Sequence, residues 1–109
     1  MAYTPIYAVD VPERAEIDAL PGALLIEFGT GWCGHCQGVQ ALIEAALRRH
    51  PDLPHLKIED GPGRRLGRSF RVKLWPTLVV LKDGQEIGRL VRPTGDKEIN
   101  ELLAGLTAC

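Results

Sequence analysis

The sequence predicts an α/β protein whose central mixed β-sheet carries helices on both faces. Short apolar runs alternate with segments whose apolar residues recur at helical spacing, which is the pattern of strands joined by helices. An Asp-Gly pair at 83–84 lies between the last two strand-like runs and predicts a β-hairpin, so the sheet is expected to end antiparallel. The length of 109 residues fits one domain, 1–109.

The first half of the chain is expected to alternate strand and helix. Residues 6–9 have the pattern of a short strand, and a helix follows over 12–19, with Pro12 at its start, where the missing N–H costs least. The nearly continuous apolar run at 24–28 is typical of a strand that is buried on both faces. A long amphipathic helix is then expected over 33–49, because Pro51 stops it.

The second half continues this alternation and then changes to a hairpin and a closing helix. The turn Gly61-Pro62-Gly63 leads into a short helix, and Lys82-Asp83-Gly84-Gln85 forms the hairpin connection. The remaining expected elements are a strand at 56–59, a helix ending near Phe70, strands at 76–81 and 87–91, and a last helix after 94–96 with Ile99, Leu102, Leu103 and Leu106 on one face.

Composition and charge narrow the functional classes. The net charge of −1 gives no indication of binding to nucleic acid or to an acidic membrane surface. The nearest approach to a basic cluster is Arg64, Arg65, Arg68 and Arg71, which we interpret as a solvated helix face. No signal peptide or membrane span is recognisable, so we expect a soluble cytoplasmic monomer. In such a reducing compartment, a pair of cysteines is catalytic or metal-binding rather than structural.

The segment Trp32-Cys33-Gly34-His35-Cys36 lies where a predicted strand is followed by a helix. Residues i and i+3 of a helix share a face, so Cys33 and Cys36 can approach closely enough to form a disulfide. The first turn of a helix presents N–H groups without helical partners, which favours a thiolate at Cys33. Cys36 is expected to be more buried and to resolve a mixed disulfide, which makes the pair redox-active.

Two further residues are expected to tune this chemistry. A protonated His35 would stabilise the Cys33 thiolate and thereby make the disulfide more oxidising. Glu27 is the only charged residue in its apolar strand, and a buried carboxyl group there can accept the proton of Cys36. Strand alternation could instead direct Glu27 to solvent. His55 is the polar partner that could approach Glu27 from a neighbouring strand.

The pair Trp75-Pro76 precedes an apolar strand, where proline is tolerated at the first position. A cis peptide bond is possible there, but it is the minority form of such bonds. If the loops of Trp32 and Trp75 meet, they form an aromatic surface around the sulfur; otherwise both tryptophans belong to the core.

Two other cysteine interpretations remain open. Cys33 and Cys36 supply two zinc ligands, but a closed site needs four, and the other candidates are His35, His50, His55 and Cys109. No second CxxC pair is present, so no metal is expected. Cys109 is expected to be an incidental exposed thiol at the terminus.

These motifs resemble the thioredoxin family along nearly the whole chain. The resemblance rests on the Trp-Cys-Gly-His-Cys segment, Glu27 six residues before Cys33, Pro76-Thr77 before an apolar strand, and Lys82-Asp83-Gly84. It implies the thioredoxin fold, a cis Trp75–Pro76 bond and thiol-disulfide exchange on protein substrates. It also implies that no cofactor is bound and that electrons come from an NADPH-dependent thioredoxin reductase. An extended peptide would bind in a groove formed by Trp32, Trp75, Pro76, Val91 and Arg92.

Several positions differ from the usual thioredoxin pattern. His35 replaces the usual proline and gives the Cys-Gly-His-Cys of protein disulfide isomerases, whereas a cytoplasmic location favours reduction. Glu27 replaces a buried aspartate, Gly29 stands where an aromatic residue is common, and His55 is expected to replace the lysine paired with the aspartate. Arg92 replaces a glycine and Trp75 an aliphatic residue, so both can alter partner choice. A redox-inactive docking domain and a metal-binding module are the alternative functions.

Overall fold

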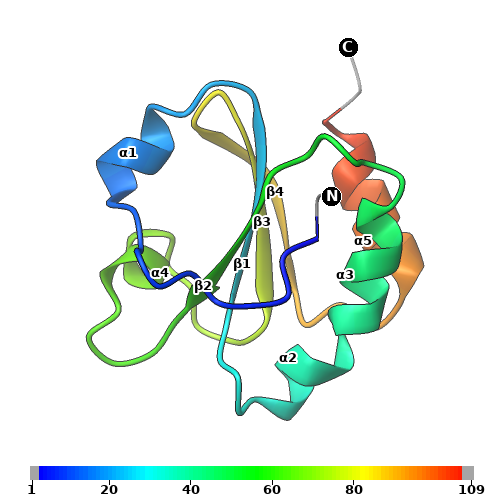
Figure 1. Ribbon diagram of the computed structural model, residues 1–109, viewed down its shortest axis with the longest axis horizontal. Coiled ribbons are helices and arrows are strands. Elements are labelled where there is room, and N and C mark those ends of the chain that lie inside the picture. Colours follow the sequence, from blue (N-terminus) through cyan, green and yellow to red (C-terminus); the bar gives the residue numbers. More distant parts are fainter. Residues whose placement is uncertain (1–2, 107–109) are drawn as a thin grey trace.

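The computed structural model describes residues 3–106, and a four-stranded sheet runs through its centre (Figure 1). The elements in chain order are α1 (Arg14–Asp18), β1 (Ala23–Gly29), α2 (Gly34–Gly38), α3 (Gln40–Leu47), β2 (His55–Glu59), α4 (Arg65–Ser69), β3 (Thr77–Lys82), β4 (Gln85–Val91) and α5 (Asp96–Ala104).

The sheet is mixed, with the strand order β2-β1-β3-β4. β1 pairs parallel with β2 and antiparallel with β3, and β3 pairs antiparallel with β4. Figure 1 shows α1 and α4 on one face of the sheet and α2, α3 and α5 on the other. The predicted fold class, a mixed sheet with helices on both faces, is therefore confirmed.

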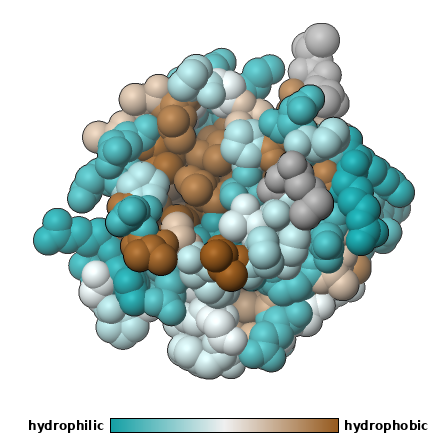
Figure 2. Space-filling view, in the orientation of Figure 1, coloured by the Kyte–Doolittle hydropathy of each residue, from teal (hydrophilic) through white to brown (hydrophobic). Residues whose placement is uncertain are grey.

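Alternation along the strands divides the core into two layers. Leu25 of β1 packs with α3 and α5, whereas Leu24, Ile26 and Phe28 pack on the other face with Ile17 of α1 and residues of α4. Glu27 follows the same alternation and therefore lies on the α3 side, where it is fully buried. In Figure 2, hydrophobic side chains gather between α1 and the sheet, while the surface over α3 is mainly hydrophilic.

The predicted strand at 6–9 is not formed. The segment follows the outer edge of β2, but the backbone N–H of Ala8 donates to the Lys57 carbonyl at 2.8 Å without starting a ladder. Ile6 and Val9 are 72% and 94% exposed, so their apolar pattern does not mark a buried strand. Thr4 bonds instead to both the ring and the carbonyl of His55, which fixes the segment through specific polar contacts.

The predicted helix over 33–49 is divided into α2 and α3. The break at Val39 follows Gly38, and glycine is a poor helix former. The side-chain amide of Gln40 donates to the Cys36 carbonyl at 2.7 Å, so a side chain satisfies a carbonyl at the break. Gln40 is the first residue of α3, and this hydrogen bond joins it to Cys36.

The hairpin between β3 and β4 forms as predicted. Asp83 and Gly84 both have positive φ angles, 51° and 80°, which a two-residue turn of this kind requires. Gly84 is also needed for space, because a Cβ there would collide with the Asp18 carbonyl. The Asp83 side chain accepts a hydrogen bond from the Gly22 N–H at 2.8 Å and ties the hairpin to the start of β1.

Candidate active site

Cys33 is the N-cap of α2, immediately after the loop that leaves β1. Its backbone is extended, and its carbonyl accepts the Gln37 N–H at 3.0 Å, which begins the helix. The N–H groups of His35 and Cys36 are thereby directed at the Cys33 sulfur. The predicted position of Cys33 at the amino end of a helix is what the structure shows.

The two sulfurs have different environments although both are free thiols. Cys33 is 9% exposed and Cys36 is 1% exposed, in agreement with the predicted order. Burial alone would raise the pKa of Cys33. Hydrogen bonds from the Cys36 thiol and from the N–H groups of Cys36 and His35, together with the charge of Arg92, outweigh burial and lower this pKa.

The pKa of Cys36 moves in the opposite direction. Burial raises it to about 12, against the effect of a backbone hydrogen bond from Thr30, and the neighbouring Cys33 and Glu27 contribute to the rise. The structure therefore makes Cys33 the sulfur that ionises more readily and keeps Cys36 as a thiol at neutral pH. This is the division of roles that an attacking and a resolving cysteine require.

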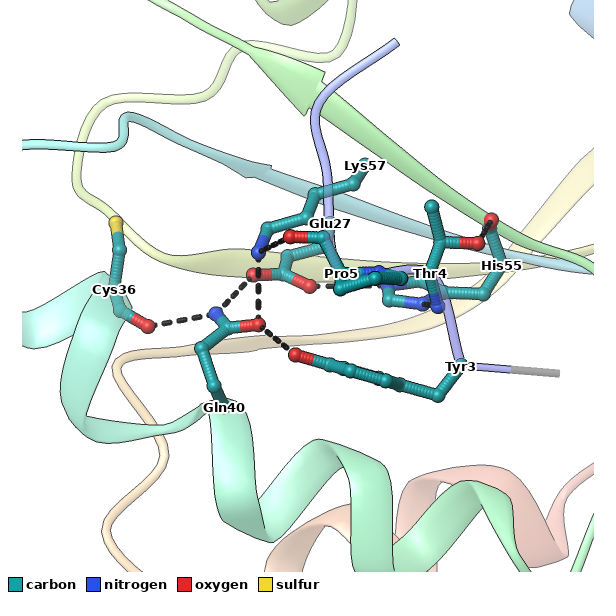
Figure 3. A network of polar contacts seen from close by, with 8 residues as sticks. All are labelled: Tyr3, Thr4, Pro5, Glu27, Cys36, Gln40, His55 and Lys57. Carbon is teal, nitrogen blue, oxygen red and sulfur yellow. Dashed lines mark hydrogen bonds and ion pairs between the residues drawn. The ribbon is translucent and has the colours of Figure 1, made fainter.

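Glu27 is held at the centre of a buried polar network, shown in Figure 3. One carboxylate oxygen lies 3.0 Å from His55 Nε2, and the other accepts a hydrogen bond from Gln40 Nε2 at 2.7 Å. The predicted approach of His55 to Glu27 is confirmed, and the alternative of a solvent-directed Glu27 is wrong.

The hydrogen bonds of His55 determine which nitrogen carries the proton. The backbone N–H of Thr4 donates to Nδ1 at 2.9 Å, so Nδ1 is an acceptor. The proton therefore resides on Nε2, which donates to Glu27. The Glu27–His55 contact is accordingly a hydrogen bond from a neutral ring rather than an ion pair.

Gln40 connects Glu27 to the cysteine pair with all of its hydrogen-bonding capacity in use. Its amide donates to both Glu27 and the Cys36 carbonyl, each at 2.7 Å. Its oxygen accepts from Tyr3 at 2.7 Å and from Lys57 at 2.9 Å. Four fixed contacts hold the amide in one orientation, so the carboxylate and the end of α2 are positioned together.

Lys57 corrects one sequence-based expectation. In the parallel register of β1 and β2, Lys57 is the residue paired with Glu27, and its ammonium group donates to Gln40 and to the Pro5 carbonyl. His55 therefore does not replace a lysine beside the acidic residue; the network contains both. Residues two apart on a strand share a face, so the strand pattern that brings His55 towards Glu27 could also have identified Lys57.

Tyr7 occupies space that the absence of a side chain at Gly29 leaves open. A Cβ at Gly29 would lie 2.6 Å from the Cys36 sulfur and 3.1 Å from the Tyr7 hydroxyl. Burial, together with nearby charges and a hydrogen bond to Cys36, raises the pKa of Tyr7. The Lys57 ammonium group lies 4.8 Å from the centre of its ring. The N-terminal segment thus supplies the aromatic group beside Cys36.

Of the predicted groove residues, Trp32 directly precedes Cys33, the charge of Arg92 acts on the Cys33 sulfur, and Pro76 is buried. The Trp75–Pro76 bond is cis, and the rings of Trp32 and Trp75 meet edge to face with centroids 5.5 Å apart. Arg92 has a positive φ of 51°, and its Nε donates to the Trp75 carbonyl at 2.9 Å. Trp32 is 74% and Val91 45% exposed. The interpretation of both tryptophans as core residues is therefore wrong.

Comparison with known proteins decides the family. The family model described as thioredoxin matches residues 10–107. The chain belongs to the thioredoxin family. Members of this family are thiol-disulfide oxidoreductases that use a redox-active cysteine pair and no cofactor, and the chain is an enzyme of this class.

Relatives within the family include proteins of plants, bacteria and fungi. Thioredoxin H2-1 of Oryza sativa subsp. japonica is 32% identical over 82 residues, which are 72% of this chain and 59% of the rice protein. Thioredoxin of Mycobacterium tuberculosis strain H37Rv is 32% identical over 88 residues, 76% of each chain. The solved structure of reduced thioredoxin 2 from Pseudomonas aeruginosa PAO1 is 53% identical, covers 92% of this chain and 93% of its own, and has a TM-score of 0.83.

Within residues 3–106, no group of three or more His, Cys, Asp or Glu side chains is arranged to hold a metal ion. No helix in the described part of the chain has the length and apolar character needed to cross a bilayer. Cys109, expected to be an incidental thiol, lies outside the described residues.

Proposed function

We propose that the chain reduces disulfides of protein substrates, with Cys33 as nucleophile, Cys36 as resolving thiol and Glu27 as proton acceptor. The observation that carries this proposal is the opposite direction of the two cysteine pKa shifts. A thiolate is the species that attacks a disulfide, and the neighbouring thiol must stay protonated until it is needed.

The reaction takes place in two exchange steps. The Cys33 thiolate attacks one sulfur of the substrate disulfide, a mixed disulfide forms, and the other substrate sulfur leaves as a thiolate. Cys36 then gives up its proton and attacks the Cys33 sulfur. The Cys33–Cys36 disulfide forms, the second substrate thiolate leaves, and two electrons have passed to the substrate.

Glu27 is the proton acceptor that the polar network favours. Its charge contributes to the raised pKa of Cys36, so proton uptake by Glu27 and ionisation of Cys36 assist each other. Hydrogen bonds from His55 and Gln40 fix the carboxylate, which is fully buried. Gln40 also donates to the Cys36 carbonyl, so it holds Glu27 and Cys36 in a fixed position relative to each other.

Substrate is expected to bind as an extended segment across the outer side of Cys33. The exposed faces of Trp32 and Val91 provide apolar contact, while Pro76 and the Arg92 backbone are joined by a hydrogen bond at 2.9 Å. A Cβ at Gly34 would meet no atom within 4 Å, so this residue leaves open space beside the reactive sulfur.

Whether the protein reduces or oxidises its substrates depends on its electron donor and on the effect of His35 on the reduction potential. We propose a cytoplasmic reductant that receives electrons from an NADPH-dependent thioredoxin reductase. Because His35 has the place that proline usually takes, the reduction potential should lie between about −270 mV, the value of thioredoxin, and about −180 mV, that of protein disulfide isomerase. The imidazole itself is exposed, and the structure gives its backbone N–H as the group acting on Cys33.

Two assays run side by side test the direction. Insulin reduction with NADPH and a reductase should be faster than refolding of a scrambled protein, and equilibration with a glutathione buffer gives the potential. Rapid refolding without insulin reduction would instead indicate an isomerase. A potential at or below that of thioredoxin would contradict the contribution of His35.

The alternative functions give different results. A docking domain would keep its partner affinity when Cys33 is changed to Ser, whereas a reductase loses its covalent capture of substrate. A metal-binding module would be purified with stoichiometric zinc or iron when no chelator is used, and elemental analysis would detect it.

A further inference from the structure

A cavity of about 440 Å³ lies beside the active site, between α4 and the segment that leads to β3. We call it the basic cavity, and the side chains that define it are Arg64, Arg68, Arg71, Lys73 and Trp75, with Asp60 and Val72 completing the wall. The chain as a whole carries a net charge of −1, so four basic residues around one cavity are a local concentration of positive charge.

Most of this positive charge is uncompensated. Arg64 pairs with Glu59, but within residues 3–106 no ion pair joins Arg68, Arg71 or Lys73 to a carboxylate. The one carboxylate in the wall, Asp60, accepts a hydrogen bond from Trp75 Nε1 at 2.8 Å. The cavity therefore offers an excess of cationic donors to whatever enters it.

The backbone that carries these residues is fixed by hydrogen bonds at the end of α4. The N–H groups of Arg71 and Val72 donate to the carbonyls of Arg68 and Gly67, each at 3.0 Å. Arg71 has a positive φ of 57°, which marks a sharp change of chain direction between α4 and Lys73. The backbone from which these cationic side chains extend is thus fixed by the fold.

Trp75 connects the basic cavity to the reactive sulfur. Its ring forms part of the cavity wall and also contacts Trp32, the residue before Cys33. A smaller pocket of about 220 Å³ adjoins the basic cavity and shares Arg64 and Trp75 with it; Trp32 and the carboxylates of Glu59 and Asp60 also line it. A peptide whose disulfide is attacked by Cys33 can therefore extend over Trp75 towards the cations.

We propose that the basic cavity binds an acidic side chain or short acidic segment that flanks the target cysteine of a protein substrate. This inference rests on the proposed disulfide reductase function and specifies its substrates. Opposite charge brings such substrates to the enzyme faster and fixes their orientation on it. Nucleic acid would satisfy the charge as well, but the connection through Trp75 to Cys33 favours a disulfide-bearing protein.

Three peptides that differ only in the residues flanking their disulfide provide the test. The flanks carry Glu, Gln or Lys, and kcat/KM is measured for each at low and high salt. For the unchanged protein we expect the Glu peptide to react about tenfold faster than the Gln peptide, with the Lys peptide slowest. This preference should disappear at high salt because the cations are exposed.

The variant R68Q/R71Q/K73Q should reduce the Glu and Gln peptides at equal rates. A matched control, R48Q/R49Q/K97Q, removes three exposed charges from the ends of α3 and α5, on the other face of the sheet, and should keep the preference. The proposal would be overturned if the cavity variant kept the preference for the Glu peptide. It would also be overturned if the control variant lost this preference to the same extent as the cavity variant. A short DNA strand that inhibits the unchanged protein but not the cavity variant, without any peptide preference, would overturn it in favour of nucleic acid.

A small uncharged disulfide separates this inference from the function on which it depends. Reduction of bis(2-hydroxyethyl) disulfide should proceed at the same rate in the unchanged protein and in the cavity variant. Failure of both to reduce it would contradict the reductase function. Normal reduction of it, without discrimination among the three peptides, would contradict only the basic cavity as a substrate site.

Discussion

The two sides of the cysteine pair differ in almost every physical respect. Cys33 follows the exposed Trp32, whose ring contacts that of Trp75, and hydrogen bonds together with the charge of the exposed Arg92 lower the pKa of Cys33. Cys36 faces a buried network around Glu27, and burial raises its pKa to about 12. The nucleophilic and the resolving sulfur are only one helical turn apart. Their different roles therefore come from the groups that surround each sulfur.

Removal of either sulfur should give the largest effect on disulfide reduction, because each cysteine carries out a different step. Cys33→Ser should abolish disulfide reduction, because Cys36, the other described thiol, is only 1% exposed and has a raised pKa. Cys36→Ser should still attack but should accumulate the mixed disulfide, which mass spectrometry detects. Capture of substrate by Cys33→Ser and not by Cys36→Ser would reverse the assignment of the two roles.

Glu27→Gln tests the role of Glu27 as proton acceptor for Cys36. The amide has nearly the same shape and can keep one contact to His55, but it cannot take up a proton. We expect the second step to slow by about 100-fold near neutral pH, the lower range for loss of a proton-transfer group. The rate of mixed-disulfide decay, followed against pH, measures it. An unchanged decay rate would exclude Glu27 as the acceptor.

Some parts of the fold and of the site follow from local patterns in the sequence. The cysteine spacing, the Asp-Gly hairpin and the lone Glu27 each rest on local chemistry, and they correctly predicted the helix N-terminus, the turn and the buried carboxylate. Gln40 lies four residues after Cys36, so helical spacing could have identified it as a neighbour.

Other contributions depend on contacts between distant parts of the chain. Tyr7 reaches Cys36 only because the N-terminal segment follows β2 and because Gly29 leaves space there. No local pattern marks such a residue, and the apolar character of its segment predicted a strand instead. The role of Arg71 in the basic cavity likewise depends on a left-handed backbone conformation that the sequence did not indicate.

Tyr7→Phe tests whether the Tyr7 hydroxyl assists the ionisation of Cys36. Loss of the hydroxyl removes a hydrogen bond to this sulfur, so the Cys36 thiolate should form less readily. The second step should slow by about two- to tenfold, the usual range for one hydrogen bond. Tyr3→Phe is the matched control, because its hydroxyl contacts Gln40 and not the sulfur. Equal slowing in both variants would mean that Tyr7 acts only through packing.

Arg92→Gln should give the smallest effect and act on the side of Cys33. Loss of the guanidinium charge should raise the pKa of Cys33, because this charge is the last of the factors that lower it. Arg92 is exposed, so the difference between variant and unchanged protein should shrink as salt is added. The pH at which alkylation of Cys33 reaches half of its maximal rate measures the change. A fall in this pH would contradict the assigned sign.

Direct titration of Cys33 tests the central claim. Thiolate absorbance near 240 nm is recorded against pH for the Cys109→Ser protein and for Cys33→Ser/Cys109→Ser, and the difference between the two curves belongs to Cys33. The account predicts ionisation below about 8.5, the value of free cysteine, with the remaining Cys36 signal appearing only in strong alkali. Ionisation of Cys33 at or above the value of free cysteine would contradict it.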